Sequence, residues 1–199
     1  ALQAYYAACD HRCPTVETVN EIAKTPLEFE PGTGWKYSLC HDVLAAVVEV
    51  LAKERFGSFV KRRIFDPLGM TESTYALSDE ERETLTEQYI HYADKNVVEN
   101  FGKGIAPFKL GTEYESGGAG LSSCAEDYSL FLQALANNGV AKNGNRILSN
   151  YGIELMRANQ LNEKQLRTFA VRHNTGYGYG YGGYHQKRGD HADQKTGGK

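Results

Sequence analysis

The sequence predicts a mostly helical fold with a few strands. Apolar residues recur at helical spacing between residues 39 and 56. Two short segments, SDEE at 78–81 and SCAE at 123–126, have the serine and glutamate of a capping box, which starts a helix. A doubly wound sheet would need strands and helices in regular alternation, and the sequence has no such pattern. A helix-rich class with few strands follows from these three observations.

The first part of the chain is expected to hold helices separated by turns. The EPGTG stretch at residues 30–34 must break any helix. Gly57 is expected to close the second helix, and Pro67 with Gly69 to stop the third. The three helices are predicted at residues 15–25, 39–56 and 58–65, and the second carries its apolar side chains at Val43, Leu44, Val47, Val48 and Leu51.

The second part of the chain continues with fewer regular elements. Tyr and Gly alternate over residues 177–184, which favours a strand, although glycine makes it a weak one. The capping serine at 78 and one of the two serines at 122 and 123 should each open a helix. Further elements are predicted as one or two short strands within the irregular region 87–109, such as 88–92, and as helical stretches at 124–136, 149–159 and 162–167.

Composition and charge exclude several classes of partner. The 199 residues carry a net charge of −3, which gives no electrostatic reason to bind nucleic acid or an anionic membrane. No apolar run approaches the roughly 20 residues that span a bilayer. Four scattered cysteines do not make a disulfide framework, and the CDHRC segment at 9–13 finds no second cluster of ligands for zinc. We therefore expect no metal, no nucleic acid and no membrane partner.

Three segments resemble, in order, the serine β-lactamase-like hydrolases, which include class C β-lactamases, family VIII esterases, D-aminopeptidases and related acyltransferases. They are FEPGTGWKYS at 29–38, RIFDPLGMTEST at 63–74 and GGAGLSSCAEDY at 117–128. The resemblance covers about residues 21–182. It implies the helical lobe of the β-lactamase/transpeptidase-like α+β fold for residues 1–172. Residues 173–199 would begin the returning α/β lobe, which is expected to be incomplete.

The resemblance also implies an activity and a catalytic residue. Such enzymes are serine hydrolases or acyltransferases that cleave a small ester, amide or lactam through an acyl-enzyme, without metal or organic cofactor. Tyr37 is identified as the general base and later the acid. Because tyrosine has an ordinary pKa of about 10, it needs a nearby cation, which the lysine of a Ser-x-x-Lys motif would supply. Leu39 stands where the family often has Asn, which favours an esterase-like member over a true β-lactamase.

The nucleophile of this family is missing from its expected place. No Ser-x-x-Lys precedes Tyr37, and the one match, SFVK from Ser58 to Lys61, lies in the helix before the second motif. A pattern that fixes two positions arises readily by chance. We therefore expect an internal piece of a larger enzyme that is inactive by itself, with Tyr37 beside an open groove at the start of the 39–56 helix.

A third family motif is matched by Lys195, Thr196 and Gly197, which would line the acyl pocket on a strand. The flanking residues lack the apolar alternation of a core strand, so these three are weak candidates.

Three alternatives stay open at this point: a complete small hydrolase using Ser58, a non-catalytic ligand-binding module, and a helical scaffold. If the chain is a piece, the 39–56 helix and the 177–184 strand should expose apolar surface, through which copies of the chain can associate.

Overall fold

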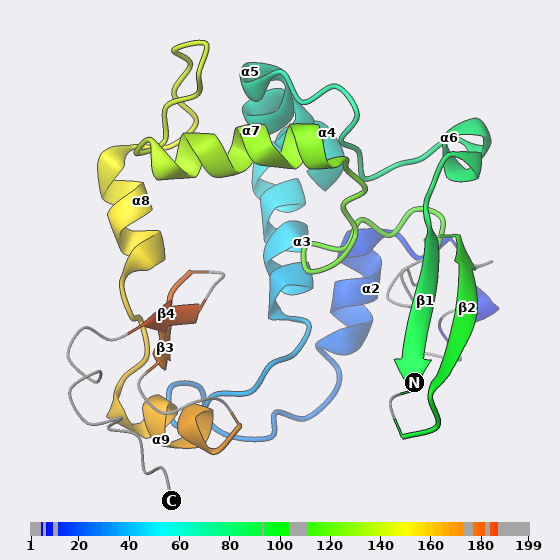
Figure 1. Ribbon diagram of the computed structural model, residues 1–199. Helices are drawn as coiled ribbons and strands as arrows, with labels where there is room; N and C mark the ends of the chain where they lie inside the picture. The colour runs from blue at the N-terminus through cyan, green and yellow to red at the C-terminus, as the bar shows by residue number, and fades with distance from the viewer. Residues whose placement is uncertain are drawn as a thin grey trace, which may run out of the picture. The chain divides into compact units, whose positions relative to one another are not determined.

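The computed structural model describes residues 5, 7–9, 12–92, 94–103, 111–172, 177–181 and 184–186 (Figure 1). It is mostly helical with a few short strands, as the sequence predicts. The chain forms two compact units. Unit 1 comprises Ala1–Thr25 and Leu39–Phe131, and unit 2 comprises Pro26–Ser38 and Leu132–Lys199. The predicted division at residues 172 and 173 stays a prediction.

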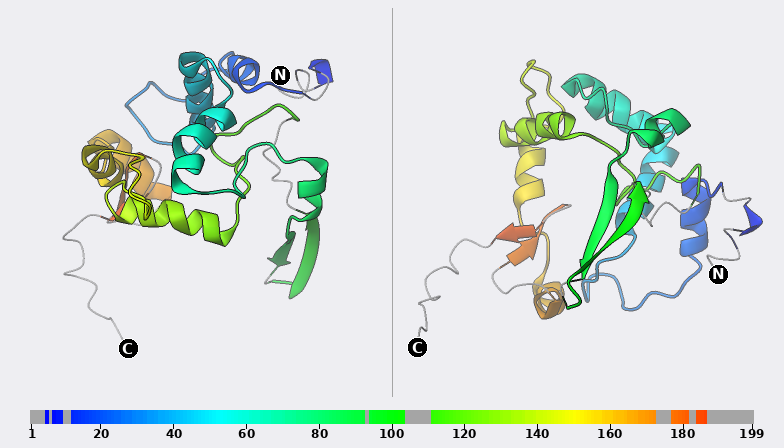
Figure 2. Two further views of the ribbon diagram at one scale, coloured as in Figure 1. Left: turned by 90° about the horizontal axis from the view of Figure 1, so that it is seen from above. Right: turned by 45° about the vertical axis from the view of Figure 1, so that its right-hand side comes forward.

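Unit 1 is built from helices and one β-hairpin. Helices α2 and α3 lie side by side, as both Figure 1 and the right-hand view of Figure 2 show. Strands β1 and β2 pair antiparallel, in the region where one or two short strands are predicted. The elements are α2 (Thr15–Ile22), α3 (Cys40–Ala52), α4 (Phe56–Val60), a π-helical turn η1 (Lys61–Phe65), α5 (Asp66–Leu68), α6 (Asp79–Glu83), β1 (Glu87–Tyr92) and β2 (Val97–Lys103).

The predicted end of the second helix is wrong. Helix α3 ends at Ala52 because Lys53 takes a left-handed conformation with φ of 56°, and its amide still donates to the Glu49 carbonyl. The Glu49 carboxylate then accepts the Phe56 amide at 2.9 Å, at the start of α4. Gly57, predicted as the terminator, therefore lies inside the next helix.

The predicted stop at Pro67 is also corrected. Pro67 lies in the first turn of α5, where a residue without an N–H is tolerated. The helix ends at Gly69 instead, which has φ of 77°, a conformation that favours glycine.

Helix α3 presents its larger apolar side chains to solvent. Its buried residues are Asp42, Ala45 and Ala46, which are small or polar. Leu51 is 78% exposed, and the other exposed apolar residues of this helix are Val43, Leu44, Val47 and Val50. An amphipathic helix ordinarily turns such residues toward a core. The exposed apolar surface predicted for the 39–56 helix is thus present on α3.

Unit 2 contains the remaining helices and a second, smaller hairpin. Helix α7 (Ala125–Ala136) begins in unit 1 and ends in unit 2. It is followed by α8 (Asn150–Arg157), whose start is capped by Ser149 through the Gly152 amide at 3.0 Å, and by α9 (Glu163–Arg172). Strands β3 (Tyr177–Tyr179) and β4 (Tyr184–Gln186) pair antiparallel. The single strand predicted over 177–184 is therefore wrong, because the segment turns back on itself.

The glycines of the Tyr-Gly segment permit a close backbone approach. A Cβ added at Gly178 would lie 2.2 Å from Asn159 Oδ1, and one at Gly180 would lie 2.1 Å from the Met156 carbonyl oxygen. The Tyr179 carbonyl in turn accepts the Gln160 amide at 2.8 Å. Glycine alternates here because β3 packs directly against the segment that follows α8.

The capping box predicted at 78–81 is confirmed and has a pH dependence. The Glu81 amide donates to Ser78 Oγ, and the Ser78 amide donates to the Glu81 carboxylate at 2.7 Å. The hydrogen bonds that the Glu81 carboxylate receives from the Ser78 backbone amide and side chain lower its pKa below the ordinary 4.5. A lowered carboxylate pKa stabilises the fold above the unfolded-state value, and that contribution is lost as the pH falls through the folded-state pKa.

We expect Ser78→Ala to raise the Glu81 pKa toward its ordinary value, because the carboxylate then loses the hydrogen bond from the Ser78 side chain. The measurement is an NMR titration of the Glu81 side-chain carboxyl in both proteins. Glu80→Ala, a change at an exposed residue of the same helix that leaves the capping box in place, is the matched control variant. An unchanged Glu81 titration would contradict the capping interpretation.

Candidate active site

The turn before Tyr37 is fixed by short-range hydrogen bonds. Gly32 has φ of +82°, which suits glycine, and the Thr33 amide and hydroxyl both donate to the Glu30 carbonyl, at 3.0 and 2.6 Å. Gly34 is buried beneath the Phe29 ring. The Asn162 side-chain amide donates to the Gly32 carbonyl at 3.0 Å and ties this turn to the start of α9. The turn is thereby held within unit 2.

Trp35 anchors the same segment to α9 and β3. Its backbone amide donates to Thr168 Oγ1 at 2.8 Å. Its ring meets Phe169 edge-on with centroids 4.9 Å apart, and Tyr179 at 5.3 Å. Phe169 is fully buried, so the indole rests on the core of unit 2. Aromatic contacts of this geometry stabilise beyond the area that they bury.

Tyr37 lies next to this anchor and is itself open to solvent. Its ring is 6.5 Å from that of Trp35, centroid to centroid, and the residue is 65% exposed. It precedes the first residue of α3 by three positions. Lys36, its neighbour, is paired with Glu28. Tyr37 is thus outside the core and three residues before α3, while the open groove expected beside it and its catalytic role both stay predictions.

The second and third sequence motifs meet in unit 1. Thr74 and Ser122 exchange two backbone hydrogen bonds of 2.9 Å. Asp127, only 5% exposed, accepts the Glu72 amide and the Ser73 hydroxyl, each at 2.8 Å. The Ser123 hydroxyl, a candidate helix cap, contacts the Ser73 hydroxyl at 2.7 Å. Asp127 therefore holds together two segments some fifty residues apart.

The glycine loop of the third motif packs tightly on the small-residue face of α3. A Cβ at Gly117 would lie 2.2 Å from the His41 carbonyl oxygen and 2.9 Å from the Ala45 Cβ. The loop contributes only backbone atoms at this contact.

Gly117→Ala is expected to destabilise the protein by about 2 kcal/mol, because the clash is with helix backbone that cannot move cheaply. Urea unfolding of the two proteins measures the difference. Gly118→Ala is the matched control, since Gly118 is exposed and its nearest neighbour is Asp42 Oδ2 at 3.3 Å. Equal effects at both positions would contradict the close-packing explanation.

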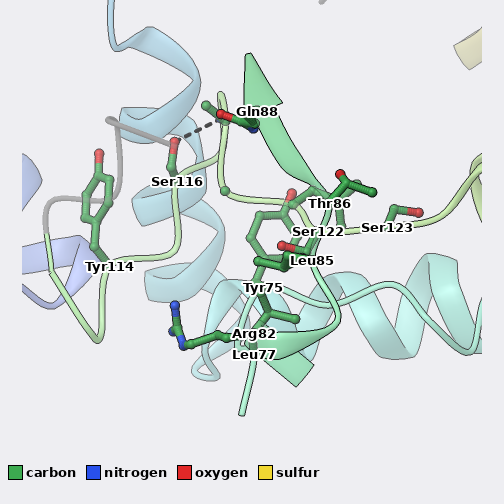
Figure 3. A pocket seen from close by; sticks show the side chains of 13 residues that line it. Tyr75, Leu77, Arg82, Leu85, Thr86, Gln88, Tyr114, Ser116, Ser122 and Ser123 are labelled. Carbon is green, nitrogen blue, oxygen red and sulfur yellow. Dashed lines mark hydrogen bonds between the residues drawn. The ribbon is translucent and has the colours of Figure 1, made fainter. Parts of the chain in front are cut away.

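A cavity of about 330 Å³ lies in unit 1, between the segment that leads into β1 and the glycine loop (Figure 3). Tyr75, Arg82 and Ser122 are among its lining residues, and the Ser116 hydroxyl at its wall accepts the Ala119 amide at 3.0 Å. Burial, with Glu115 and Asp42 nearby, raises the pKa of Tyr75 to about 12. Tyr75 therefore keeps its proton at neutral pH and can donate a hydrogen bond, but it cannot serve as a base.

Two buried carboxylates support this region. Asp42 accepts the Tyr114 hydroxyl at 2.7 Å, and burial together with that bond raises the Tyr114 pKa. Glu115 accepts Arg55 Nε at 3.1 Å and the Gly57 amide at 2.7 Å. These contacts of Asp42 and Glu115 join segments that are distant in sequence, so the two carboxylates hold the fold of unit 1 together.

Ser58, the alternative nucleophile, is exposed on α4. Lys61, which would have to activate it, pairs with Asp66 instead. This pairing counts against Ser58 as a nucleophile.

Lys195, Thr196 and Gly197 lie outside the described residues. Within the described part of the chain, no group of three or more His, Cys, Asp or Glu side chains is placed to hold a metal ion. In that same part, every helix is too short or too polar to cross a membrane.

Comparison with known proteins gives concordant relatives. A family model described as Beta-lactamase matches residues 1–198. Esterase EstB of Burkholderia gladioli is 33% identical over 135 residues, which is 61% of this chain and 34% of EstB. Lovastatin esterase of Penicillium rubens is 40% identical over 73 residues, 37% of this chain and 18% of that protein.

Among solved structures, EstCE1, a hydrolase with promiscuous acyltransferase activity, is similar with a TM-score of 0.69 and 25% identity. The match covers 87% of this chain and 46% of EstCE1. The mostly helical structure thus corresponds to part of the β-lactamase/transpeptidase-like fold. The chain spans less than half the length of each of these relatives.

Proposed function

Since this chain belongs to the Beta-lactamase family, we propose that it supplies the catalytic tyrosine, Tyr37, to a serine hydrolase or acyltransferase working through an acyl-enzyme. The observation that carries the proposal is the placement of Tyr37. It is 65% exposed, yet it adjoins a segment anchored by Trp35 to a fully buried phenylalanine. A general base must be both accessible to its partner and held in position.

The proposed substrate class is a small ester. Two of the relatives are esterases by name, and EstCE1 is a hydrolase with acyltransferase activity. Leu39, in place of the Asn that is common two residues after the tyrosine, also favours an ester over a lactam. Amides and lactams are the alternative substrates.

Tyr37 would accept and return one proton in each of the two half-reactions. A serine hydroxyl attacks the ester carbonyl while the Tyr37 phenolate takes its proton, and the phenol then returns that proton to the departing alkoxide. The products of this half are an acyl-serine and an alcohol. Water, or a second alcohol in the acyltransferase reaction, then attacks the acyl-serine while Tyr37 accepts its proton. The bond to the serine oxygen breaks, and Tyr37 returns the proton to that oxygen, which regenerates the serine hydroxyl. The positive charge of a lysine beside the phenol would stabilise the phenolate form that this role requires.

We propose that the serine and lysine come from a part of the protein outside this chain. The chain spans 34% of EstB and 46% of EstCE1. Helix α3 begins three residues after Tyr37 and exposes five large apolar side chains. A segment outside this chain that carries the nucleophile would have to bring its serine near Tyr37.

This chain alone is expected not to hydrolyse nitrocefin or p-nitrophenyl esters above background, because attack and activation both need the absent pair. A spectrophotometric assay with each chromogenic substrate measures this, with Ser58→Ala as the matched variant. Turnover that disappears in Ser58→Ala would make this chain a complete hydrolase. Turnover that survives in it would identify a nucleophile elsewhere in the chain.

The 330 Å³ cavity of unit 1 favours a second candidate, a non-catalytic ligand-binding module. Titration calorimetry of this chain with p-nitrophenyl acetate, and with its acid and alcohol products, measures binding and distinguishes this module from the proposed hydrolase fragment. Saturable binding that is lost when a bulky Ser122→Trp side chain fills the cavity would favour the module.

A further inference from the structure

Two cysteine sulfur atoms are in contact at the start of unit 1. The Cys9 and Cys13 Sγ atoms lie 2.7 Å apart, and the Cys13 amide also donates to Cys9 Sγ at 3.2 Å. Both residues are reduced in the structure. Cys13 is 1% exposed, whereas Cys9 is partly open to solvent.

The backbone brings the two thiols together. The Cys9 amide donates to the Tyr5 carbonyl and the Arg12 amide to the Cys9 carbonyl, so the chain is turning at this point. Cys13 then takes a left-handed conformation with φ of 46°, uncommon for a residue other than glycine, directly before Pro14. That conformation is maintained against its cost by the surroundings. The two sulfurs lie 2.7 Å apart, so only a small further approach is needed to form a disulfide.

The turn is also attached to a distant part of unit 1. Arg12 Nε and its terminal nitrogen donate to the two Glu113 carboxylate oxygens at 2.6 and 3.0 Å, and the Glu113 amide donates to the Arg12 carbonyl at 2.8 Å. Two residues after Cys13, Thr15 Oγ1 accepts the Glu115 amide at 2.9 Å. Residues 113–115 lead straight into the glycine loop, so the position of Cys13 is fixed independently of Cys9.

We propose that Cys9 and Cys13 are a dithiol site that exchanges with a small disulfide, such as glutathione disulfide, to form an intramolecular Cys9–Cys13 bond. The more accessible Cys9 attacks first as its thiolate, forms a mixed disulfide and releases one glutathione thiol. Cys13 then loses its proton and attacks the Cys9 sulfur, which releases the second glutathione thiol. Two protein thiols are oxidised and one glutathione disulfide is reduced to two thiols.

The electrostatics of the pair suit this order. Burial and the hydrogen bond to Cys9 raise the pKa of Cys13 to about 12, so Cys13 keeps its proton and can donate it to the Cys9 sulfur. The Cys9 sulfur can accept that hydrogen bond and is partly open to solvent, so it is the sulfur placed to meet a small disulfide first. Once Cys9 is capped by glutathione, the hydrogen bond that helps to hold the proton on Cys13 is gone.

The test treats this chain with excess glutathione disulfide at mild alkaline pH, quenches with acid, alkylates the remaining thiols and maps the peptides by mass spectrometry. The expected product is a peptide spanning both residues that is lighter by about 2 Da, because two hydrogens have left, and unalkylated. In Cys13→Ser, the Cys9 mixed disulfide should persist at a level about tenfold or more above that in the parent chain, because nothing resolves it. Cys40→Ser is the matched control, since Cys40 is exposed and lies in α3. This variant should give the same peptide lighter by about 2 Da as the parent chain.

Persistent glutathione on Cys9 in the parent chain, with Cys13 still alkylatable, would overturn the proposal. The proposal would also be overturned if Cys9 and Cys13 were both alkylated after a glutathione disulfide treatment that modifies Cys40 in the same sample. This readout uses the parent chain, so it remains decisive even if Cys13→Ser fails to fold. Neither outcome bears on the role proposed for Tyr37.

Discussion

Replacing Tyr37 by phenylalanine is expected to lower kcat by about 10²- to 10⁴-fold in a protein that joins this chain to a Ser-x-x-Lys segment, because the phenol is proposed to move the proton in both half-reactions. The ring, and with it the contact to Trp35, is retained in this variant. The loss should therefore fall on kcat and leave ester binding nearly unchanged. Steady-state hydrolysis of a p-nitrophenyl ester measures both constants.

Tyr151→Phe is the matched control for this experiment. Tyr151 is a tyrosine of the same unit with 69% exposure, and it lies on α8. Removing its hydroxyl should leave kcat within twofold, as roughly expected for a surface change away from the reacting groups. A Tyr37→Phe protein with the activity of this control would refute the catalytic role of Tyr37.

Asp127→Ala is expected to destabilise the protein by about 3–5 kcal/mol, because two hydrogen bonds to a buried carboxylate are lost and their donors are left without it. The donors are the Glu72 amide and the Ser73 hydroxyl, and Ser73 is itself buried. Urea unfolding followed by circular dichroism gives the free energy, and an unchanged m-value would show that the loss is one of stability alone.

Glu126→Ala controls for the change of charge at the start of α7. Glu126 is the exposed acidic neighbour in the same first turn. Its removal should cost well under about 1 kcal/mol, the usual value of a surface charge near a helix N-terminus. A comparable loss in both variants would mean that helix electrostatics, rather than the contacts to residues 72 and 73, account for the effect.

Local patterns predicted the elements better than they predicted the contacts between them. The capping box at Ser78 and the apolar period of α3 depend on neighbours within one or two turns, and both were recognised. The end of α3 was missed because Lys53, rather than a glycine, takes the left-handed position. The hairpin at residues 177–186 was missed because its glycines were interpreted only as strand residues. Gly178 and Gly180 are needed for close contact with Asn159 and Met156, which are distant in sequence.

The candidate site divides in the same way. Tyr37 was found through the motif around it, since Pro, Gly and Trp at fixed spacing are visible in the letters. Asp127 was noticed only as part of a motif, and its bonds to residues 72 and 73 could not be foreseen without the fold. The exposed apolar face of α3 was predicted from the missing nucleophile and not from periodicity. Periodicity predicts a helix, but it does not say which side the rest of the protein covers.

The discontinuity of unit 2 has a consequence for synthesis on the ribosome. Trp35 is joined to α9 through Thr168, 133 residues later in the chain. At a translation rate of about 5–20 residues per second, roughly 7–27 seconds pass between the emergence of the two. Unit 1 can begin to fold in that interval, with residues 26–38 as an untethered loop. Tyr37 therefore acquires its anchor only when translation has passed α9, and truncated nascent chains should carry this tyrosine without its aromatic support.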